Sequence, residues 1–306
     1  MAILNSLPKI FSLNSYPKVE NILLVGCGGT GGHLAPHLCR YVSVINESRE
    51  TRDGVDRDKI RLFFADGDLV EQKNLLRQHF IIPDIAKNKA VVLAERYAAA
   101  FGIQIAVVPK DLETLEDFEF FNSSRRRTDR SDLIIGCVDN NASRKLINDW
   151  FMGKANENKD GFSWRGHFWI DSGNEEKAGQ VVCGYSPPSR GSYSSEKVKA
   201  EITSSIVSGE FSLPSVVELY PELLNDEGGF NSELSCADRA ISAPQNMQTN
   251  VTAATIIMNF VQKVIGGDEI KSHAVEFSID NAFTTKLNTV DNIAMVNEER
   301  RRFWER

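Results

Sequence analysis

The chain has 306 residues, of which 42% are hydrophobic and 25% charged, and its formal net charge is −7 at pH 7. This composition is ordinary for a soluble globular protein, and the length fits one large α/β domain. The acidic balance argues against general nucleic-acid binding, which needs a basic face. No apolar run approaches the ~20 residues of a membrane span, and no secretory pattern opens the chain. We therefore expect a cytoplasmic protein without a membrane partner.

Near the N-terminus an apolar run leads directly into a glycine cluster. Ile22–Val25 predicts a strand, Gly26-x-Gly28-x-x-Gly31 a tight turn, and residues 31–44 a helix. In a nucleotide fingerprint the first glycine permits the turn, the second lets phosphate approach the backbone, and the third packs helix against strand. The helix N-terminus then favours an anion. A purely structural glycine turn is the alternative.

Strand-like and helix-like stretches alternate as far as residue 185. Such alternation indicates right-handed βαβ crossovers and hence an α/β fold with a Rossmann-like, doubly wound, mainly parallel sheet. The further strands are expected at Ile60–Phe64, Ile103–Val108, Leu133–Cys137, His167–Ile170 and Gln180–Tyr185, and the helices at 87–101, 113–121 and 142–154.

Two polar segments interrupt this alternation. Asn46–Lys59 is expected to be a solvated loop, and Ser123–Ser131 a basic loop that includes Arg130. The basic loop serves either solubility or the docking of an acidic partner.

The alternation of strand-like and helix-like stretches ends after residue 186. Residues 187–243 are expected to form a loop-rich crossover, with a short helix near 195–207. A long helix follows at about 246–265, and Ala274–Ile279 and Ala282–Leu287 predict an antiparallel hairpin. We divide the chain into a nucleotide-binding core (1–186), this crossover, and a C-terminal part (244–306) with a charged tail that completes the same domain.

Acidic and then cationic side chains follow the second predicted strand. An acid at this place in a dinucleotide dehydrogenase holds the ribose hydroxyls, and Asp66 can do the same for any adenine nucleotide. Arg77 and Lys89 come soon after it. A hydride-transfer enzyme gains little from such cations. An enzyme that expels pyrophosphate from ATP needs them, because negative charge accumulates on the leaving group.

Asp139 follows the fourth predicted strand, whose carboxyl end lies over the nucleotide crevice in such a sheet. Mg²⁺ seeks carboxylate oxygen, so Asp139 is placed to hold it against the phosphates. The alternative is an N-cap for the next helix, although Asn140 or Asn141 could cap that helix equally well.

Taken in order, these motifs resemble the ThiF/MoeB superfamily of ubiquitin-activating-type adenylyltransferases over about residues 20–185. The motifs are Gly26-Cys-Gly-Gly-Thr-Gly31, Asp66-x-Asp68, Asn74-Leu-x-Arg77-Gln78, Lys89 and Asp139-Asn140-x-x-x-Arg144. The resemblance implies that ATP and Mg²⁺ are used to adenylate the C-terminal glycine carboxylate of a small ubiquitin-like or sulfur-carrier protein, with release of pyrophosphate.

The resemblance also implies roles for individual residues. Asp66 would bind ribose, Asn74, Arg77 and Lys89 the phosphates, and Asp139 Mg²⁺, with Gln78 as a secondary contact. The whole implied nucleotide-binding set is Gly26, Gly28, Gly29, Gly31, Asp66, Asp68, Asn74, Arg77, Gln78 and Lys89.

Other family features are absent or altered. Many relatives carry two Cys-x-x-Cys pairs that bind zinc, whereas the five cysteines here are scattered, so no structural zinc is expected. Relatives form dimers in which an N-terminal cation crosses the interface, so a homodimer is expected. The only candidates for that cation before the first predicted strand are Lys9 and Lys18.

Two further motifs resemble the ThiF branch encoded with PRTRC gene clusters. They are Ser235-Cys236-Ala-Asp-Arg-Ala and Gln245-x-x-x-Thr-Asn250-Val.

Cys236 is the candidate nucleophile. In relatives that pass on the activated carboxylate, a loop cysteine accepts it as a thioester, and a conjugating-enzyme-like protein can then receive it. Arg239 lies three residues after Cys236 and could stabilise its thiolate. A structural role is the alternative for Cys236, and the apolar setting of Cys183 favours such a role there.

In the predicted reaction the partner carboxylate attacks the α-phosphate in line, while Arg77, Lys89 and Mg²⁺ on Asp139 stabilise the departing pyrophosphate. No general base is needed, because a carboxylate is already ionised at pH 7. The competing hypotheses are a non-catalytic scaffold or heterodimer subunit of the same fold that binds a ubiquitin-like protein, and a NAD-dependent dehydrogenase. The dehydrogenase would leave the two cations and Asp139 unexplained.

Overall fold

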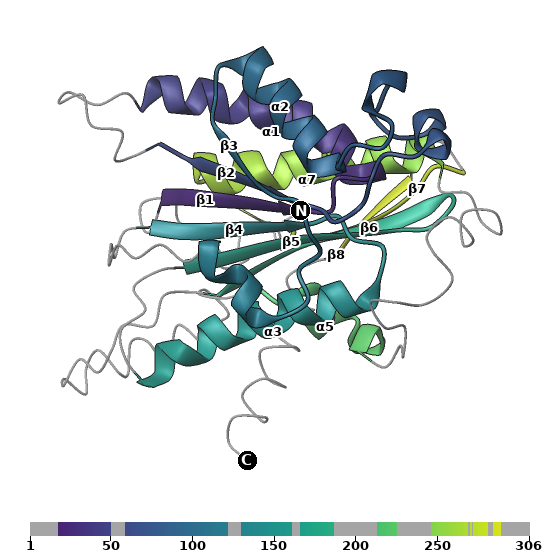
Figure 1. Cartoon of the computed structure of the whole chain (residues 1–306). Coiled ribbons are helices and arrows are strands. Elements are labelled where there is room, and N and C mark those ends of the chain that lie inside the picture. Colours follow the sequence, from purple (N-terminus) through teal and green to yellow (C-terminus); the bar gives the residue numbers. More distant parts are fainter. Residues whose placement is uncertain are drawn as a thin grey trace, which may run out of the picture.

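The structure is a computed structural model that describes residues 18–49, 59–121, 130–160, 166–186, 213–224, 246–268, 270, 272–280 and 284–288. These residues form an eight-stranded sheet with helices on both faces (Figure 1). None of the described helices is long and apolar enough to cross a membrane.

The strands lie in the order β3-β2-β1-β4-β5-β6-β7-β8. Strands β1 to β5 are parallel to one another, and β6, β7 and β8 continue the sheet with antiparallel pairing. The strand bounds are β1 Lys18–Val25, β2 Arg61–Ala65, β3 Ile105–Val108, β4 Arg130–Gly136, β5 Gly166–Asn174, β6 Ala178–Ser186, β7 Ala274–Ser278 and β8 Thr284–Asn288.

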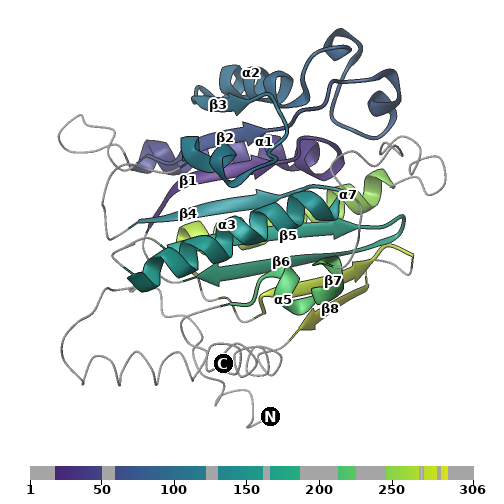
Figure 2. The ribbon, with the colours of Figure 1, turned by 60° about the horizontal axis from the view of Figure 1, so that its bottom comes forward.

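The helices form one layer on each face of the sheet. In Figure 1, α1 (Gly29–Ser48), α2 (Lys89–Phe101) and α7 (Met247–Gly266) lie above the sheet, and Figure 2 shows α3 (Asn141–Asp160) and α5 (Val216–Leu219) on the opposite face. The short 3₁₀ helices are η2 Gln72–Leu76, η3 Ile82–Asp84, η4 Leu115–Phe121 and η5 Pro221–Leu224.

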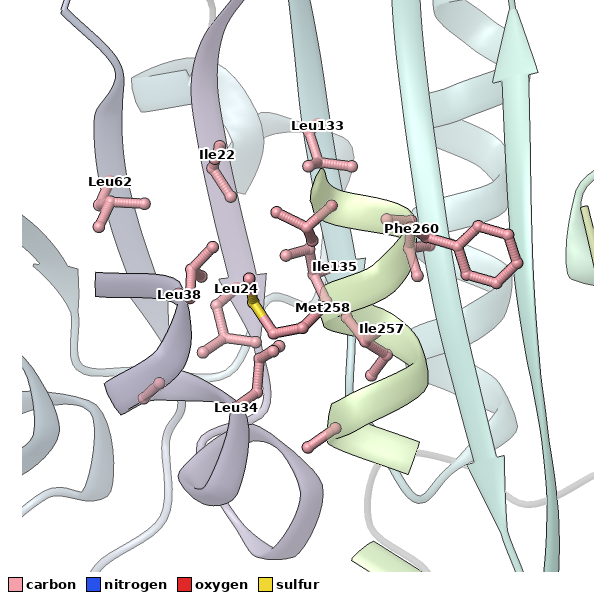
Figure 3. Packing of buried hydrophobic residues seen from close by; sticks show 14 of the residues in the cluster. Ile22, Leu24, Leu34, Leu38, Leu62, Leu133, Ile135, Ile257, Met258 and Phe260 are labelled. Atoms are coloured by element: carbon pink, nitrogen blue, oxygen red, sulfur yellow. The ribbon is translucent and has the colours of Figure 1, made fainter. Parts of the chain in front are cut away.

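Alternation along β1 supplies both layers of the core. Ile22 and Leu24 face α1 and α7, whereas Leu23 and Val25 belong to the cluster on the α3 face. Figure 3 shows the first cluster, in which side chains of α1 and α7 meet those of β1 and β4. This packing fixes the start of α1 above the carboxyl end of β1.

The chain reverses its direction of travel across the sheet between β1 and β4. From β1 it proceeds outward to β2 and β3, and then returns to β4 on the other side of β1. In open α/β sheets, ligands bind outside the carboxyl ends of the strands at such a switch point. The glycine turn after β1 and Asp139 after β4 both lie there.

The α/β fold class, with its mainly parallel sheet and antiparallel C-terminal strands, is confirmed. Several local predictions were wrong. Arg130 and Ser131 belong to β4 and are buried, because this strand begins before the apolar run that signalled it. Residues 46–48 extend α1, and Asn46 exchanges two hydrogen bonds with the Ile60 backbone. Residues 115–121 form a 3₁₀ helix. The short helix predicted near 195–207, Cys236 and the charged tail lie outside the described residues.

Candidate functional site

The glycine turn lies between the ends of β2 and β4. Gly26 has φ +88°, and a Cβ there would lie 2.5 Å from the Cys137 carbonyl oxygen, so only glycine fits. Its N–H donates to the Ala65 carbonyl at 2.9 Å. A Cβ at Gly31 would collide with the Gly26 carbonyl, so glycine lets α1 start directly against the strand. The turn therefore has the geometry that the fingerprint predicts.

Asp66 is tied to this turn through its carboxylate. One oxygen accepts the Cys27 N–H at 2.6 Å and the other accepts the Asp68 N–H at 2.8 Å. Burial raises the pKa of Asp66 to about 6, against the pull of Lys89 and of these two N–H donors. The residue predicted to bind ribose thus also holds the end of β2 against the glycine turn.

Lys89 is a buried cation surrounded by carboxylates. Its Nζ lies 2.6 Å from Asp68 Oδ2, and its side chain is 8% exposed, against 62% for Asp68. Burial alone would lower the pKa of Lys89, but Asp66, Asp68 and Asp139 raise it. Lys89 is therefore protonated at neutral pH.

Asn74 shapes the segment that carries Arg77 and Gln78. Its Oδ1 accepts the Glu71 N–H at 2.7 Å, and its carbonyl accepts the N–H groups of Arg77 and Gln78. The Gln78 amide faces the glycine turn, 3.7 Å from the position of a Cβ on Gly28. Within the described part of the chain, the Arg77 guanidinium forms no ion pair. It is available to an anionic ligand.

Asp139 lies at the carboxyl end of β4 with an exposed side chain. Asn140 Oδ1 accepts the Ser143 N–H at 2.7 Å, so Asn140 is the residue that caps α3. The sequence had left Asp139, Asn140 and Asn141 open as candidates for this cap. Asp139 is also one of the three carboxylates that raise the pKa of Lys89.

Arg144 belongs to the predicted motif after β4, but the motif does not indicate its partner. Arg144 is buried, and its Nε lies 3.1 Å from Asp171 Oδ2 on β5. It also donates to the carbonyl oxygens of Val138 at 2.7 Å and Ser172 at 3.1 Å. Arg144 therefore fixes the backbone that immediately precedes Asp139. The sequence feature that could have indicated this partner is a buried strand that ends in Asp171-Ser-Gly-Asn.

The described cysteines are poor nucleophiles. Burial raises the pKa of both Cys39 and Cys183 to about 12, and it raises the pKa values of Cys27 and Cys137 as well. These thiols stay protonated at neutral pH. Cys236, the candidate nucleophile, lies outside the described residues.

A family model described as "ThiF family" matches residues 17–297. The chain belongs to the ThiF family. The resemblance to the ThiF/MoeB superfamily that was predicted from the motifs is confirmed at this level.

Individual relatives are distant. Ubiquitin-like modifier-activating enzyme 5 of Dictyostelium discoideum is 27% identical over 185 residues, which cover 57% of this chain and 41% of that protein. The E. coli MccB structure with succinimide superposes with a TM-score of 0.52 at 16% identity, over 90% of this chain and 66% of MccB. The MccB structure with ATP gives 0.52 at 15% identity, over 90% and 65%. At such identities the solved structures show a shared fold.

The chain spans less than half of the curated relative and just under two thirds of MccB.

Proposed function

We propose that this ThiF-family chain uses ATP and Mg²⁺ to adenylate the C-terminal carboxylate of a small ubiquitin-like or sulfur-carrier protein, and releases pyrophosphate. The observation that carries the proposal is that Asp66 is bonded to the glycine turn, that the cation of Lys89 is buried against Asp68, and that Asp139 follows β4, the strand next to β1. The name of the curated relative and the titles of MccB structures with ATP and with N-formylated MccA support it.

The residues present fit a magnesium–nucleotide complex. Asp139 offers an exposed carboxylate, the ligand type that Mg²⁺ prefers, at the carboxyl end of β4. Bound there, Mg²⁺ would neutralise negative charge on the phosphates. Asp66 would accept hydrogen bonds from the ribose hydroxyls, because its carboxylate faces the turn that would receive the phosphates.

Lys89 has to change partner when ATP binds. It is held by Asp68 at 2.6 Å, and the more exposed Asp68 carboxylate can turn to solvent when a phosphate replaces it. Lys89 and Arg77 would then stabilise charge on the departing pyrophosphate. The attacking carboxylate is ionised at neutral pH, so the site needs no general base.

The test is ATP–pyrophosphate exchange with a panel of small proteins that end in glycine. Asp139→Ala and Lys89→Ala should each reduce exchange by at least about a hundredfold, because each removes charge stabilisation of the transition state. Lys87→Ala, at an exposed lysine two residues from Lys89, and Asp149→Ala, at an exposed acid on α3, are matched controls that should retain exchange. Unchanged exchange in Asp139→Ala or Lys89→Ala would refute the assignment.

We extend the proposal to Cys236 as the acceptor of the activated carboxylate, with a conjugating-enzyme-like protein as a further acceptor. Cys236→Ala should retain pyrophosphate exchange and lose a thiol-sensitive covalent adduct, measured by intact mass. Loss of exchange in this variant would instead indicate a structural cysteine. We also propose a cytoplasmic homodimer, to be checked by light scattering during gel filtration.

A further inference from the structure

A cluster of two buried polar side chains and one half-buried polar side chain joins the starts of α1 and α7 to the end of β5. Thr30 lies in the first turn of α1, Asn174 is the last residue of β5, and Asn250 lies in the first turn of α7. The Thr30 hydroxyl donates to Asn250 Oδ1 at 3.2 Å. Asn174 Nδ2 donates to Thr30 Oγ1 at 2.6 Å and to Asn250 Oδ1 at 3.3 Å. We call these three residues the polar triad.

The triad fixes which way the Asn250 amide faces. Its Oδ1 receives two donors, and a flipped amide would set its own NH₂ group against that of Asn174. Asn174 is oriented in turn, because its Oδ1 accepts the Ser172 hydroxyl at 3.1 Å. Asn250 Nδ2 must therefore point away from Thr30.

Asn250 Nδ2 points at the glycine turn. A Cβ added to Gly29, the first residue of α1, would collide with this atom, so the amide lies directly over Gly29. Asn250 is 1% exposed, and within the described residues its Nδ2 has no hydrogen-bond partner. A buried donor without an acceptor is unfavourable and calls for an explanation.

Packing of α1 against α7 does not require this arrangement. Further along the two helices the contact is apolar, with Leu34 and Leu38 of α1 in one cluster with Ile257 of α7 (Figure 3). Among the described residues, the hydrogen bond between side chains of the two helices, from Thr30 to Asn250, lies at the end beside the nucleotide turn. That end also carries the unpaired N–H groups of the first turn of α1, which favour an anion.

We propose that the polar triad positions the phosphate-binding turn of this protein, with the Asn250 amide holding Gly29 and Thr30 in the conformation that receives the phosphates of a nucleoside triphosphate. The inference rests on the proposed use of ATP. The adenosine part of the ligand would be held elsewhere, by Asp66 at the end of β2.

The test compares the affinities of ATP with Mg²⁺ and of adenosine by calorimetry. Asn250→Ala should weaken ATP binding about tenfold, the loss expected for one well-placed hydrogen-bonding group, and leave adenosine binding unchanged. Thr30→Val, which keeps the shape and removes the hydroxyl, should give the same selective loss. The inference is overturned if ATP affinity does not change, or if ATP and adenosine weaken by the same factor in both variants.

Asn246→Ala is the matched control. Asn246 is the same residue type on the same helix, and it caps α7 by accepting the Gln248 N–H at 2.9 Å. Its loss should lower the melting temperature and leave the ratio of ATP to adenosine affinity unchanged. A changed ratio would mean that loosening α7 alone accounts for the effect, and would overturn the inference.

Gly29→Ala offers a second, independent test. The added methyl group should displace the Asn250 amide and weaken ATP binding. Because both changes act on the same contact, Gly29→Ala combined with Asn250→Ala should not weaken binding by the product of the two single losses. Multiplying losses would contradict the inference. Failure of the unmodified protein to bind ATP would refute the proposed function itself, a result distinct from all of these.

Discussion

Asp66 has two roles at the candidate site. Its carboxylate accepts two backbone N–H groups, from Cys27 and Asp68, and it is the residue expected to bind ribose. Burial nevertheless raises its pKa to about 6, so it lies closer to protonation at neutral pH than an ordinary aspartate. Nucleotide binding at the site should therefore change in mild acid.

We predict that ATP affinity falls as the pH drops through about 6, since a protonated Asp66 accepts fewer hydrogen bonds from ribose. Stability follows the opposite trend. The folded-state pKa lies above the ordinary 3.8, so the contribution of Asp66 to stability is present below pH 3.8 and is lost as the pH rises through about 6. Calorimetric titrations across this window would measure the first effect. In Asp66→Asn the affinity should be weak and nearly independent of pH, and an unaltered pH profile in that variant would assign the titration to another group.

Local motifs allowed Asp66, Lys89 and Asp139 to be predicted from sequence, because each directly follows a predicted strand or begins a predicted helix. Asp171, Asn174 and Asn250 were missed as site residues because their meaning depends on distant partners. Asn174 and Thr30 are separated by 144 positions in the chain, and no spacing rule connects them. Asn74 stays a predicted phosphate ligand, and in the structure its side chain and carbonyl shape the turn before Gln78.

At the scale of elements, helix ends show why boundaries are predictable where the chain marks them. Asn88 accepts the Val91 N–H to begin α2, and Gly102 ends it with φ +65°. Gly267 ends α7 in the same way, close to the predicted position. The end of α1 has no such glycine, and its predicted end was four residues too early relative to Ser48. Strand β4 was predicted too short because its first residues, Arg130 and Ser131, are polar and yet buried.

Two glycines with positive φ should respond differently to substitution. Gly102→Ala should cost about 1–2 kcal/mol in free energy of unfolding, which is the penalty of a left-handed conformation. It should add no steric cost, because no atom lies within 4 Å of the added Cβ. Gly26→Ala adds a collision with the Cys137 carbonyl at 2.5 Å and should abolish nucleotide binding. Urea denaturation and ATP titration of both variants would check this. Loss of ATP binding in Gly102→Ala would instead show that ATP binding at the glycine turn depends on the C-terminal end of α2.

At the scale of the whole molecule, the candidate site lies where two halves of the sheet meet. Strands β1 to β3 supply the glycine turn and Asp66, whereas Asp139 follows β4 and Arg144 of α3 pairs with Asp171 of β5. A nucleotide at this boundary would contact both halves. The buried Arg144 joins β4, α3 and β5 behind the site, so its loss should affect both stability and chemistry.

Arg144→Met should lower the free energy of unfolding by about 3–5 kcal/mol, since it leaves the Asp171 carboxylate buried without its cation. Adding Asp171→Asn removes that charge, so the double variant should recover part of the loss. Burial already raises the pKa of Asp171, and Arg144 opposes this. Without Arg144 the carboxyl should protonate more readily, and the stability deficit of Arg144→Met should shrink as the pH falls.

Denaturation of both variants at several pH values would measure these effects. Strictly additive losses in the double variant would mean that the pair contributes nothing as a pair, and that Arg144 acts through its other hydrogen bonds, to Asn141 Oδ1 and to the Val138 and Ser172 carbonyls. In either case pyrophosphate exchange should remain impaired in the double variant, because neither of the two substituted side chains can hold the backbone before Asp139 as the guanidinium does. Recovery of exchange together with stability would contradict this positioning role.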